Sequence, residues 1–259
     1  FLVKLFFDHI TGKLTNYDLV YSLALATFDE DEYGYALDNG WIPLSWYYKK
    51  LHQMTWINAR GSRLILPKFT FSKKQRKILN KKDITVKIFD KLDENLSKIV
   101  SDIYVKYIQH KDYYEKGNEE DSEILIRDDP IDWKYFIYYY KNTPVAFTEL
   151  KVFASKHVVT GQFAWDYENP KLSLGTYATL FEIKWAIENK CKKYYLSYSY
   201  EKSSMYKSRF DGFEFWTGRG WMSNKNIYKK LCEKDSSIEN ILDLNAYQEE
   251  YFNLIKGEK

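Results

Sequence analysis

The segment of residues 172–200 constrains the fold of this chain most. It begins with Leu172-Ser173-Leu174-Gly175-Thr176-Tyr177, continues as ATLFEIKWAIENK and ends in KKYYLSYSY. This pattern predicts a helix over residues 173–189, which starts at a glycine, and a strand over residues 193–200. The first N–H groups of a helix have no intrahelical partners, so this start can bind a phosphate or an ester carbonyl. The alternative is that Gly175 only begins the helix.

The residues around this segment predict a sheet. Apolar and polar side chains alternate in residues 83–89, and three further strand-like runs follow at residues 133–140, 144–154 and 156–165. The joints at residues 141–144 and 154–156 are short enough for antiparallel hairpins. Helical spacing of apolar residues predicts a helix over residues 91–110, and a polar connection follows over residues 112–132. The fold class is therefore α/β (α+β) with a mixed, mostly antiparallel sheet, and a closing helix is expected over residues 238–255.

The front of the chain is expected to form a smaller N-terminal domain, residues 1–90, before a larger one, residues 91–259. Residues 1–30 predict one or two strands and a short helix, and Asn39-Gly40 marks a turn or helix stop. Residues 62–71 are extended and interrupted by Pro67. Ser72 is a predicted N-cap for a helix over residues 73–82.

This last helix is strongly basic. It contains Lys73, Lys74, Arg76, Lys77, Lys81 and Lys82, with no acidic residue before Asp83. Contacts to a phosphate backbone need positive charge rather than base reading, so the helix suits an RNA stem. The alternative is a solvated helix face, which normally has interleaved acidic residues.

Composition excludes several classes of protein. A net charge of +3 permits a nucleic-acid partner without requiring one. The two cysteines and four histidines have no metal-ligand spacing, so no metal is expected. The longest apolar runs fall short of the ~18 residues of a membrane span, which predicts a cytoplasmic protein with no membrane partner. The many tyrosines suit packing in a sheet better than base stacking.

The predicted element order resembles the GNAT acyltransferase fold. The sequence SLGTYATLFEI, with the later Met205-Tyr206-Lys207, resembles the arginyl- and leucyl-tRNA–protein transferases. Further similar features are Gly40-Trp41, the segment from Arg60 to Arg63, the spaced Phe69, Ser72, Gln75, Arg76 and Lys77, and Trp165-Asp166. The resemblance covers roughly residues 33–90 and 144–215. This chain departs from the family pattern because it has no cysteine before Cys191 and has Ser203 or Ser204 where a cysteine is usual.

The resemblance implies an enzyme that moves an amino acid from aminoacyl-tRNA to an amine, most simply a protein N-terminus, which in the family is acidic. Asp166 is the expected group that orients or deprotonates the amine, although a carboxylate there can also cap a loop. Tyr198 and Tyr206 would complete the catalytic set. The donor would be bound by Ser173, Leu174, Gly175, Thr176, Tyr177 and Lys207. Nucleic acid would be bound by Arg60, Arg63, Lys73, Lys74, Gln75, Arg76 and Lys77.

The phosphate loop argues against a typical CoA donor. CoA-dependent GNAT enzymes resemble one another in a Gln/Arg-x-x-Gly-x-Gly/Ala loop, and Leu174 stands at its first glycine. Aminoacyl-tRNA is therefore favoured over acyl-CoA, and no cofactor is expected. Three alternatives remain: acylation of another amine such as a DNA nucleobase or small metabolite, an acetyl-CoA enzyme, and a nucleic-acid-binding protein without activity. Expected partners are tRNA or another nucleic acid and a protein or peptide acceptor.

Overall fold

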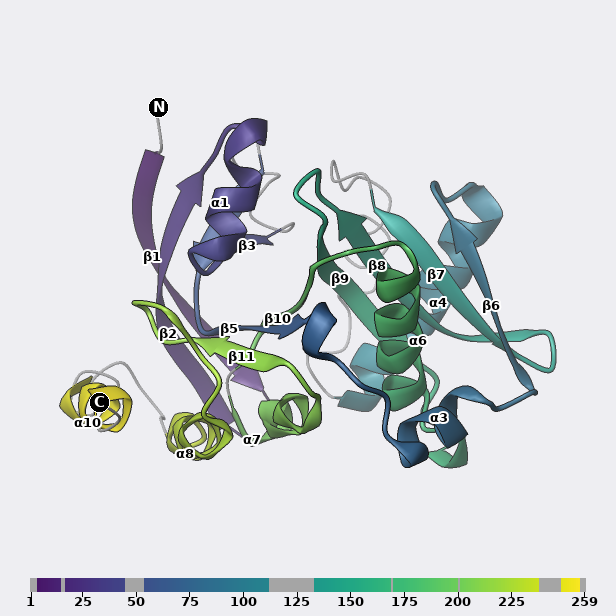
Figure 1. The fold of residues 1–259 in the computed structure, drawn as a ribbon. Helices are drawn as coiled ribbons and strands as arrows, with labels where there is room; N and C mark the ends of the chain where they lie inside the picture. The colour runs from purple at the N-terminus through teal and green to yellow at the C-terminus, as the bar shows by residue number, and fades with distance from the viewer. Residues whose placement is uncertain are drawn as a thin grey trace. The chain divides into compact units, whose positions relative to one another are not determined.

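The fold divides into two compact units. The computed structural model describes residues 4–14, 17–44, 54–111, 133–168, 170–199, 201–237 and 248–256 (Figure 1). Unit 1 comprises Phe1–Phe69 and Tyr195–Lys259, and unit 2 comprises Thr70–Tyr194. Unit 2 is thus inserted between two separate stretches of unit 1. The predicted domains 1–90 and 91–259 stay a prediction.

Unit 2 contains an antiparallel run of four strands. They are β6 (Ile84–Phe89), β7 (Lys134–Tyr140), β8 (Thr143–Val152) and β9 (His157–Trp165), paired in that order. Lys141 and Asn142 have φ of 48° and 68°, the left-handed values that a tight hairpin turn requires. The strands and hairpins predicted from the sequence are confirmed.

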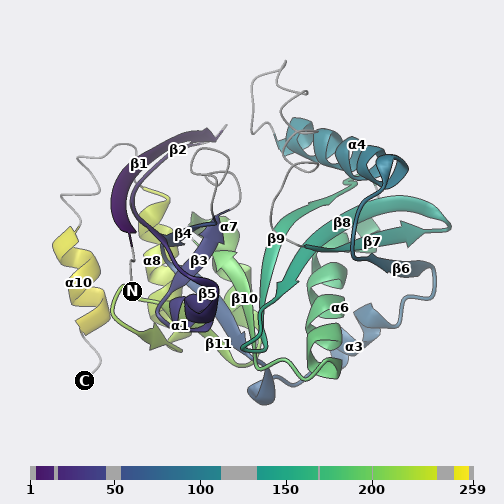
Figure 2. The ribbon, with the colours of Figure 1, turned by 90° about the horizontal axis from the view of Figure 1, so that it is seen from above.

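Helices cover both faces of this run of strands. Figure 2 shows α4 (Glu94–Lys111) on one face and α6 (Leu174–Glu188) on the other. On the α4 side, Val100, Ile103 and Tyr104 form a core cluster with strand residues such as Ile137 and Phe147. Burial of such a continuous apolar surface is the main stabilisation of a helix on a sheet. The short helix Pro170–Leu172 leads into α6.

The basic helix α3 (Lys73–Leu79) packs against α6 within unit 2. The predicted N-cap is confirmed. Ser72 Oγ accepts the Gln75 N–H at 3.2 Å, and Gln75 Oε1 accepts the Ser72 N–H at 2.8 Å, which is a capping box. The helix ends at Leu79 rather than residue 82, with Asn80 as its C-cap.

Unit 1 contains a four-stranded antiparallel sheet in the order β1-β2-β4-β3. Its strands are β1 (Lys4–Leu14), β2 (Tyr17–Thr27), β3 (Trp41–Leu44) and β4 (Thr55–Asn58). The short helices Glu30–Glu32 and α1 (Tyr33–Asp38) connect β2 to β3. The predicted helix stop at Asn39-Gly40 is confirmed, and Gly40 has a φ of 80°.

A second group of strands in unit 1 joins distant parts of the chain. Its order is β12 (Trp221–Met222), β11 (Phe213–Trp216), β5 (Gly61–Ile65) and β10 (Lys193–Tyr198), and β10 begins in unit 2. The helical elements are Leu66–Lys68, α7 (Glu201–Ser204), Met205–Arg209, α8 (Lys225–Asp235) and α10 (Gln248–Lys256).

The mixed α/β class and the predicted order of strands, helix and strand are confirmed. The predicted strand 193–200 ends at Tyr198. The predicted connection over residues 112–132 and the start of the closing helix, residues 238–247, lie outside the described residues. Among the residues that the structure describes, no helix has the length and apolar character needed to cross a membrane.

Candidate active site

The start of α6 leaves its N–H groups without a side-chain cap. Ser173 lies just before the helix with a φ of 52° and a ψ of 45°, and its side chain accepts no hydrogen bond from the first turn. Its backbone oxygen accepts the Tyr177 N–H at 2.9 Å. The backbone N–H groups of Leu174, Gly175 and Thr176 therefore keep the capacity to bind an oxygen of a ligand.

Two aromatic rings of β9 lie beside this helix start. Phe163 and Trp165 stack with ring centroids 4.9 Å apart. A Cβ atom added at Gly175 would meet Phe163 at 3.7 Å and Trp165 at 4.0 Å, which is ordinary van der Waals contact. The other predicted donor residues differ in exposure: Leu174 and Tyr177 are buried, and burial raises the pKa of Tyr177, whereas Thr176 is exposed.

The basic segment is tied to the same loop. Lys81 Nζ donates to the carbonyl oxygens of Lys171, at 3.0 Å, and Leu172, just before the start of α6. Lys73, Lys74, Arg76 and Lys77 are exposed on α3. The structure thus brings the predicted nucleic-acid-binding residues of α3 to the predicted donor helix, while Gln75 uses its amide oxygen in the capping box.

Asp166 follows β9 directly and is half-buried. Its backbone N–H donates to Val145 O at 2.7 Å, and its Oδ1 accepts the Glu168 N–H at 2.8 Å. This is the loop-capping contact that the sequence allowed as an alternative. A carboxylate can accept further hydrogen bonds, so the catalytic role of Asp166 stays a prediction.

The remaining predicted catalytic and donor residues lie in unit 1. Lys207 is buried, and its Nζ donates to Leu196 O at 2.8 Å and to Ser199 Oγ at 3.0 Å. Tyr206 is 44% exposed. Tyr198 lies in β10, and its side chain is outside the described residues. Their predicted roles stay predictions.

Both predicted arginines of unit 1 are paired with carboxylates. Arg60 forms a bidentate pair with Asp235, in which Nη2 donates to Oδ1 at 3.1 Å. Arg63 donates through Nε to Glu214 at 2.9 Å, and its guanidinium lies 3.9 Å from the Trp221 ring centroid. The structure thus gives both arginines carboxylate partners. Binding of nucleic acid by these arginines stays a prediction.

A buried acid on α6 was not predicted. Glu182 is 3% exposed and accepts hydrogen bonds from Tyr138 OH at 2.8 Å, Thr148 Oγ1 at 2.7 Å and Tyr194 OH. Burial raises the pKa of Glu182, although the three hydroxyl donors favour its charged form. The signal was present in the sequence, because residues 174, 178 and 186, at four-residue spacing from it, are Leu, Ala and Ala.

The described residues contain no group of three or more His, Cys, Asp or Glu placed to hold a metal ion. Both cysteines are buried, and burial raises the pKa of Cys232 to about 11.

Comparison with known families identifies the central part of the chain. Residues 99–217 match the family described as arginine-tRNA-protein transferase, C terminus. The predicted resemblance is confirmed for residues 144–215, whereas that of residues 33–90 lies outside the match. The matched residues run from within α4 to β11 and include both Asp166 and the start of α6.

The chain also has distant likenesses to solved structures. L-PGS from Bacillus licheniformis is 11% identical with a TM-score of 0.43, over 66% of this chain and 52% of that chain. FemX is 9% identical with a TM-score of 0.41, over 75% of this chain and 80% of that chain. A GCN5-related N-acetyltransferase from Kribbella flavida is 14% identical with a TM-score of 0.35, over 64% and 53%. The match therefore spans about half the length of L-PGS. Comparison with curated proteins gives no match.

Proposed function

We propose that this protein is an aminoacyltransferase that moves an amino acid from aminoacyl-tRNA to an amine, most simply the N-terminus of a protein. The observation that carries this proposal is the arginine-tRNA-protein transferase domain over residues 99–217. The uncapped N–H groups at the start of α6 support it, because they lie in that domain and suit a developing oxyanion.

The proposed reaction needs little covalent chemistry from the protein. The nitrogen of a neutral amine attacks the ester carbonyl carbon and forms a tetrahedral intermediate with a negatively charged oxygen. Collapse of the intermediate forms the amide and breaks the ester C–O bond, and the ribose oxygen leaves with the proton that the amine loses. The backbone N–H groups of Leu174, Gly175 and Thr176 would bind the oxyanion. Asp166 would orient the amine, accept this proton and pass it to the leaving ribose oxygen.

The basic helix α3 supports tRNA as the carrier of the amino acid. Its exposed Lys73, Lys74 and Lys77 provide charge for phosphates, and Lys81 connects the same segment to the loop before α6. Each phosphate contact steepens the fall of the logarithm of the binding constant with the logarithm of the salt concentration by roughly one. A donor bound through its phosphates needs no pyrophosphate loop, which agrees with Leu174 in place of a glycine. The proposal therefore includes no cofactor.

The substitution Gly175→Ala tests the site without removing a stabilising group. The added methyl would make ordinary contacts with Phe163 and Trp165, and alanine favours the helix by about 1 kcal/mol over glycine. Stability should therefore be kept or rise. Because displacement of a reacting group by about 1 Å can cost about 100-fold in rate, transfer should fall by about tenfold or more.

The assay measures transfer from a mixture of radiolabelled aminoacyl-tRNAs to peptides that begin with Asp or Glu, with nucleosides and small amines as other acceptors. Gly220→Ala is the matched control, because a Cβ atom there meets nothing within 4 Å. Asp166→Asn should abolish transfer and leave tRNA binding intact. Folded protein that gives no product with any aminoacyl-tRNA and any acceptor would refute the proposal. If product forms with nucleosides or small amines but not with peptides, the acceptor is one of these amines and not a protein.

A further inference from the structure

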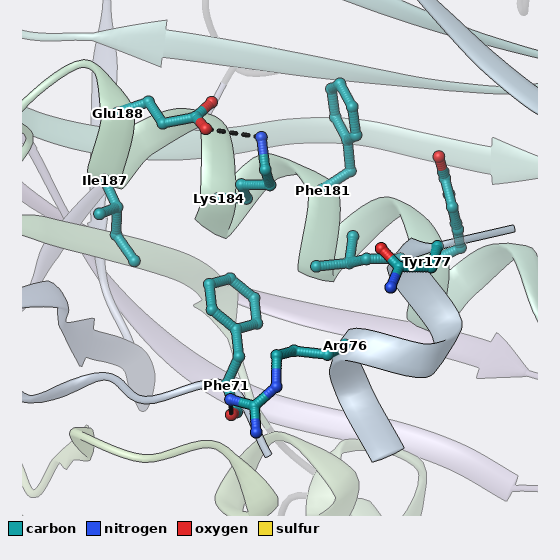
Figure 3. Close-up of a pocket in the computed structure, with 9 residues that line it drawn as sticks. Phe71, Arg76, Tyr177, Phe181, Lys184, Ile187 and Glu188 are labelled. Carbon is teal, nitrogen blue, oxygen red and sulfur yellow. Dashed lines mark hydrogen bonds and ion pairs between the residues drawn. The ribbon is translucent and has the colours of Figure 1, made fainter. Parts of the chain in front are cut away.

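A pocket lies between α3 and α6 within unit 2, beside the contact between these two helices. Its volume is about 550 Å³. Phe71 and Arg76 line it from the α3 side, and Tyr177, Lys184 and Ile187 line it from α6 (Figure 3). Binding sites for small organic groups commonly have volumes of about 300–1,000 Å³, so the pocket is large enough for one.

The middle of the pocket is apolar. The ring of Phe71 points into the space between the two helices, and the side chain of Ile187 extends toward it from α6 (Figure 3). Ile187 is 37% exposed, which is a large fraction for an apolar side chain. A flat, partly apolar group would bury both the ring of Phe71 and the side chain of Ile187, whereas an isolated phosphate would bury neither of these apolar surfaces.

The α3 edge of the pocket is positively charged. Arg76 Nη1 donates to the backbone oxygen of Phe71, which holds the guanidinium beside the pocket. A guanidinium has further N–H donors that can bind an anion. Lys184 is instead paired with Glu188 at 2.6 Å, so the α6 edge has little net charge. Lys73 and Lys77 are exposed on the same helix as Arg76 and extend this charge beyond the pocket.

We infer that this pocket binds one unpaired nucleotide of the RNA substrate, with its base against Phe71 and Ile187 and its phosphate at Arg76. A base fits the apolar centre of the pocket, which a phosphate alone would leave unfilled. A phosphate fits the guanidinium of Arg76, which an apolar group alone would leave without an anion. The inference rests on the proposed function for the identity of the partner as RNA.

Binding of short fluorescent RNAs to the full chain tests this inference. Single-stranded RNA is compared with single-stranded DNA of the same length and with an RNA duplex long enough to stay paired in the assay, by fluorescence anisotropy. The variants are Phe71→Leu, which keeps an apolar side chain but removes the ring, Phe71→Trp, which keeps a ring, Ile187→Ala and Arg76→Gln. Ile88→Ala is the matched control for Ile187, because Ile88 is 41% exposed on β6. Lys98→Gln, at an exposed position of α4, is the control for Arg76.

Single-stranded RNA should bind the wild type more tightly than the duplex. Loss of base stacking typically weakens binding roughly 5- to 150-fold. The affinity of Phe71→Leu should fall by a factor in this range, and that of Phe71→Trp should not. Arg76→Gln should reduce the salt slope by about one. Equal affinity of Phe71→Leu, Ile187→Ala and the controls would overturn the inference, as would a preference for the duplex or for DNA.

The transfer assay separates this inference from the proposed function. In one outcome the wild type transfers amino acids while Phe71→Leu and Ile187→Ala bind RNA as tightly as the control Ile88→Ala. This outcome would support the proposed function and overturn the pocket assignment. Protein that binds single-stranded RNA through these residues but transfers nothing would support the pocket assignment and refute the function.

Discussion

The buried carboxyl of Glu182 makes a quantitative prediction about stability. Replacement by alanine removes the acceptor of three hydroxyl groups, those of Tyr138, Thr148 and Tyr194. A buried polar group that loses its partner costs about 1–3 kcal/mol, and removal of buried methylenes adds a cavity cost. Glu182→Ala should therefore lower the free energy of unfolding by about 3–6 kcal/mol, a large part of the about 5–15 kcal/mol of a typical domain.

Glu182→Gln should be much milder, because the amide keeps one acceptor oxygen and its NH₂ group can donate to a hydroxyl that turns. A cost of about 1 kcal/mol is expected, near the net contribution of one hydrogen bond. The two variants differ in hydrogen bonding and in volume, so the difference between their costs measures the lost acceptor and the cavity together.

The same carboxyl should also make stability depend on pH. Burial raises the pKa of Glu182 in the folded state, so the folded protein binds this proton more tightly than the unfolded chain. This contribution to stability is present in full below the ordinary pKa of glutamic acid, about 4.3, and is lost as pH rises through the folded-state pKa. Glu182→Gln has no such proton and should lack this slope.

Urea denaturation of the wild type and both variants between pH 4 and pH 8 measures these effects. The difference in unfolding free energy between wild type and Glu182→Gln should change with pH in favour of the variant as pH rises. A constant difference across this range would show that the pKa is not raised. A cost below about 1 kcal/mol for Glu182→Ala would show that the three hydroxyls find other partners.

Three further predictions concern single positions. Ser72→Ala should cost about 1 kcal/mol in urea denaturation and Ser72→Gly only a few tenths, because glycine is a better N-cap than alanine; equal costs would contradict the capping role. Gly161→Ala should lower the free energy of unfolding by about 1–3 kcal/mol, since its Cβ would lie 2.7 Å from Glu149 Oε2, whereas Gly220→Ala should be neutral. Cys232 should react with thiol reagents at pH 8 only after denaturation, because it is buried and, with a pKa of about 11, roughly one thiol in a thousand is ionised; rapid reaction of the native protein would contradict this.

Local signals in the sequence were sufficient for unit 2. Ser72 and Gln75 predicted a capped helix because both groups of a capping box lie within one turn. The hairpin at Lys141 and Asn142 was predicted because the short joint over residues 141–144 leaves room only for a turn between antiparallel strands. These features depend on residues close together in the chain.

Pairings between distant residues could not be predicted in this way. Leu64 of β5 pairs with Phe213 of β11, and nothing in either strand specifies the other. For the candidate site, the start of α6 and Asp166 were found from their motifs, whereas the carboxylate partners of Arg60 and Arg63 depend on such distant contacts. Glu182 was missed because an acidic residue on a helix is usually solvated, although its four-residue spacing from Leu174 and Ala178 places it on the buried face.

The insertion of unit 2 between the two stretches of unit 1 has a consequence for synthesis on the ribosome. Strands β6, β7, β8 and β9 and helices α3, α4 and α6 of unit 2 emerge between residues 73 and 188 and can assemble as soon as they leave the exit tunnel. Strand β5 emerges earlier, but its partner β11 follows about 150 residues later, which takes roughly 7–30 s at ordinary translation speeds. During that interval β5 has an unpaired edge, so nascent chains stalled before residue 213 should be the ones that chaperones bind.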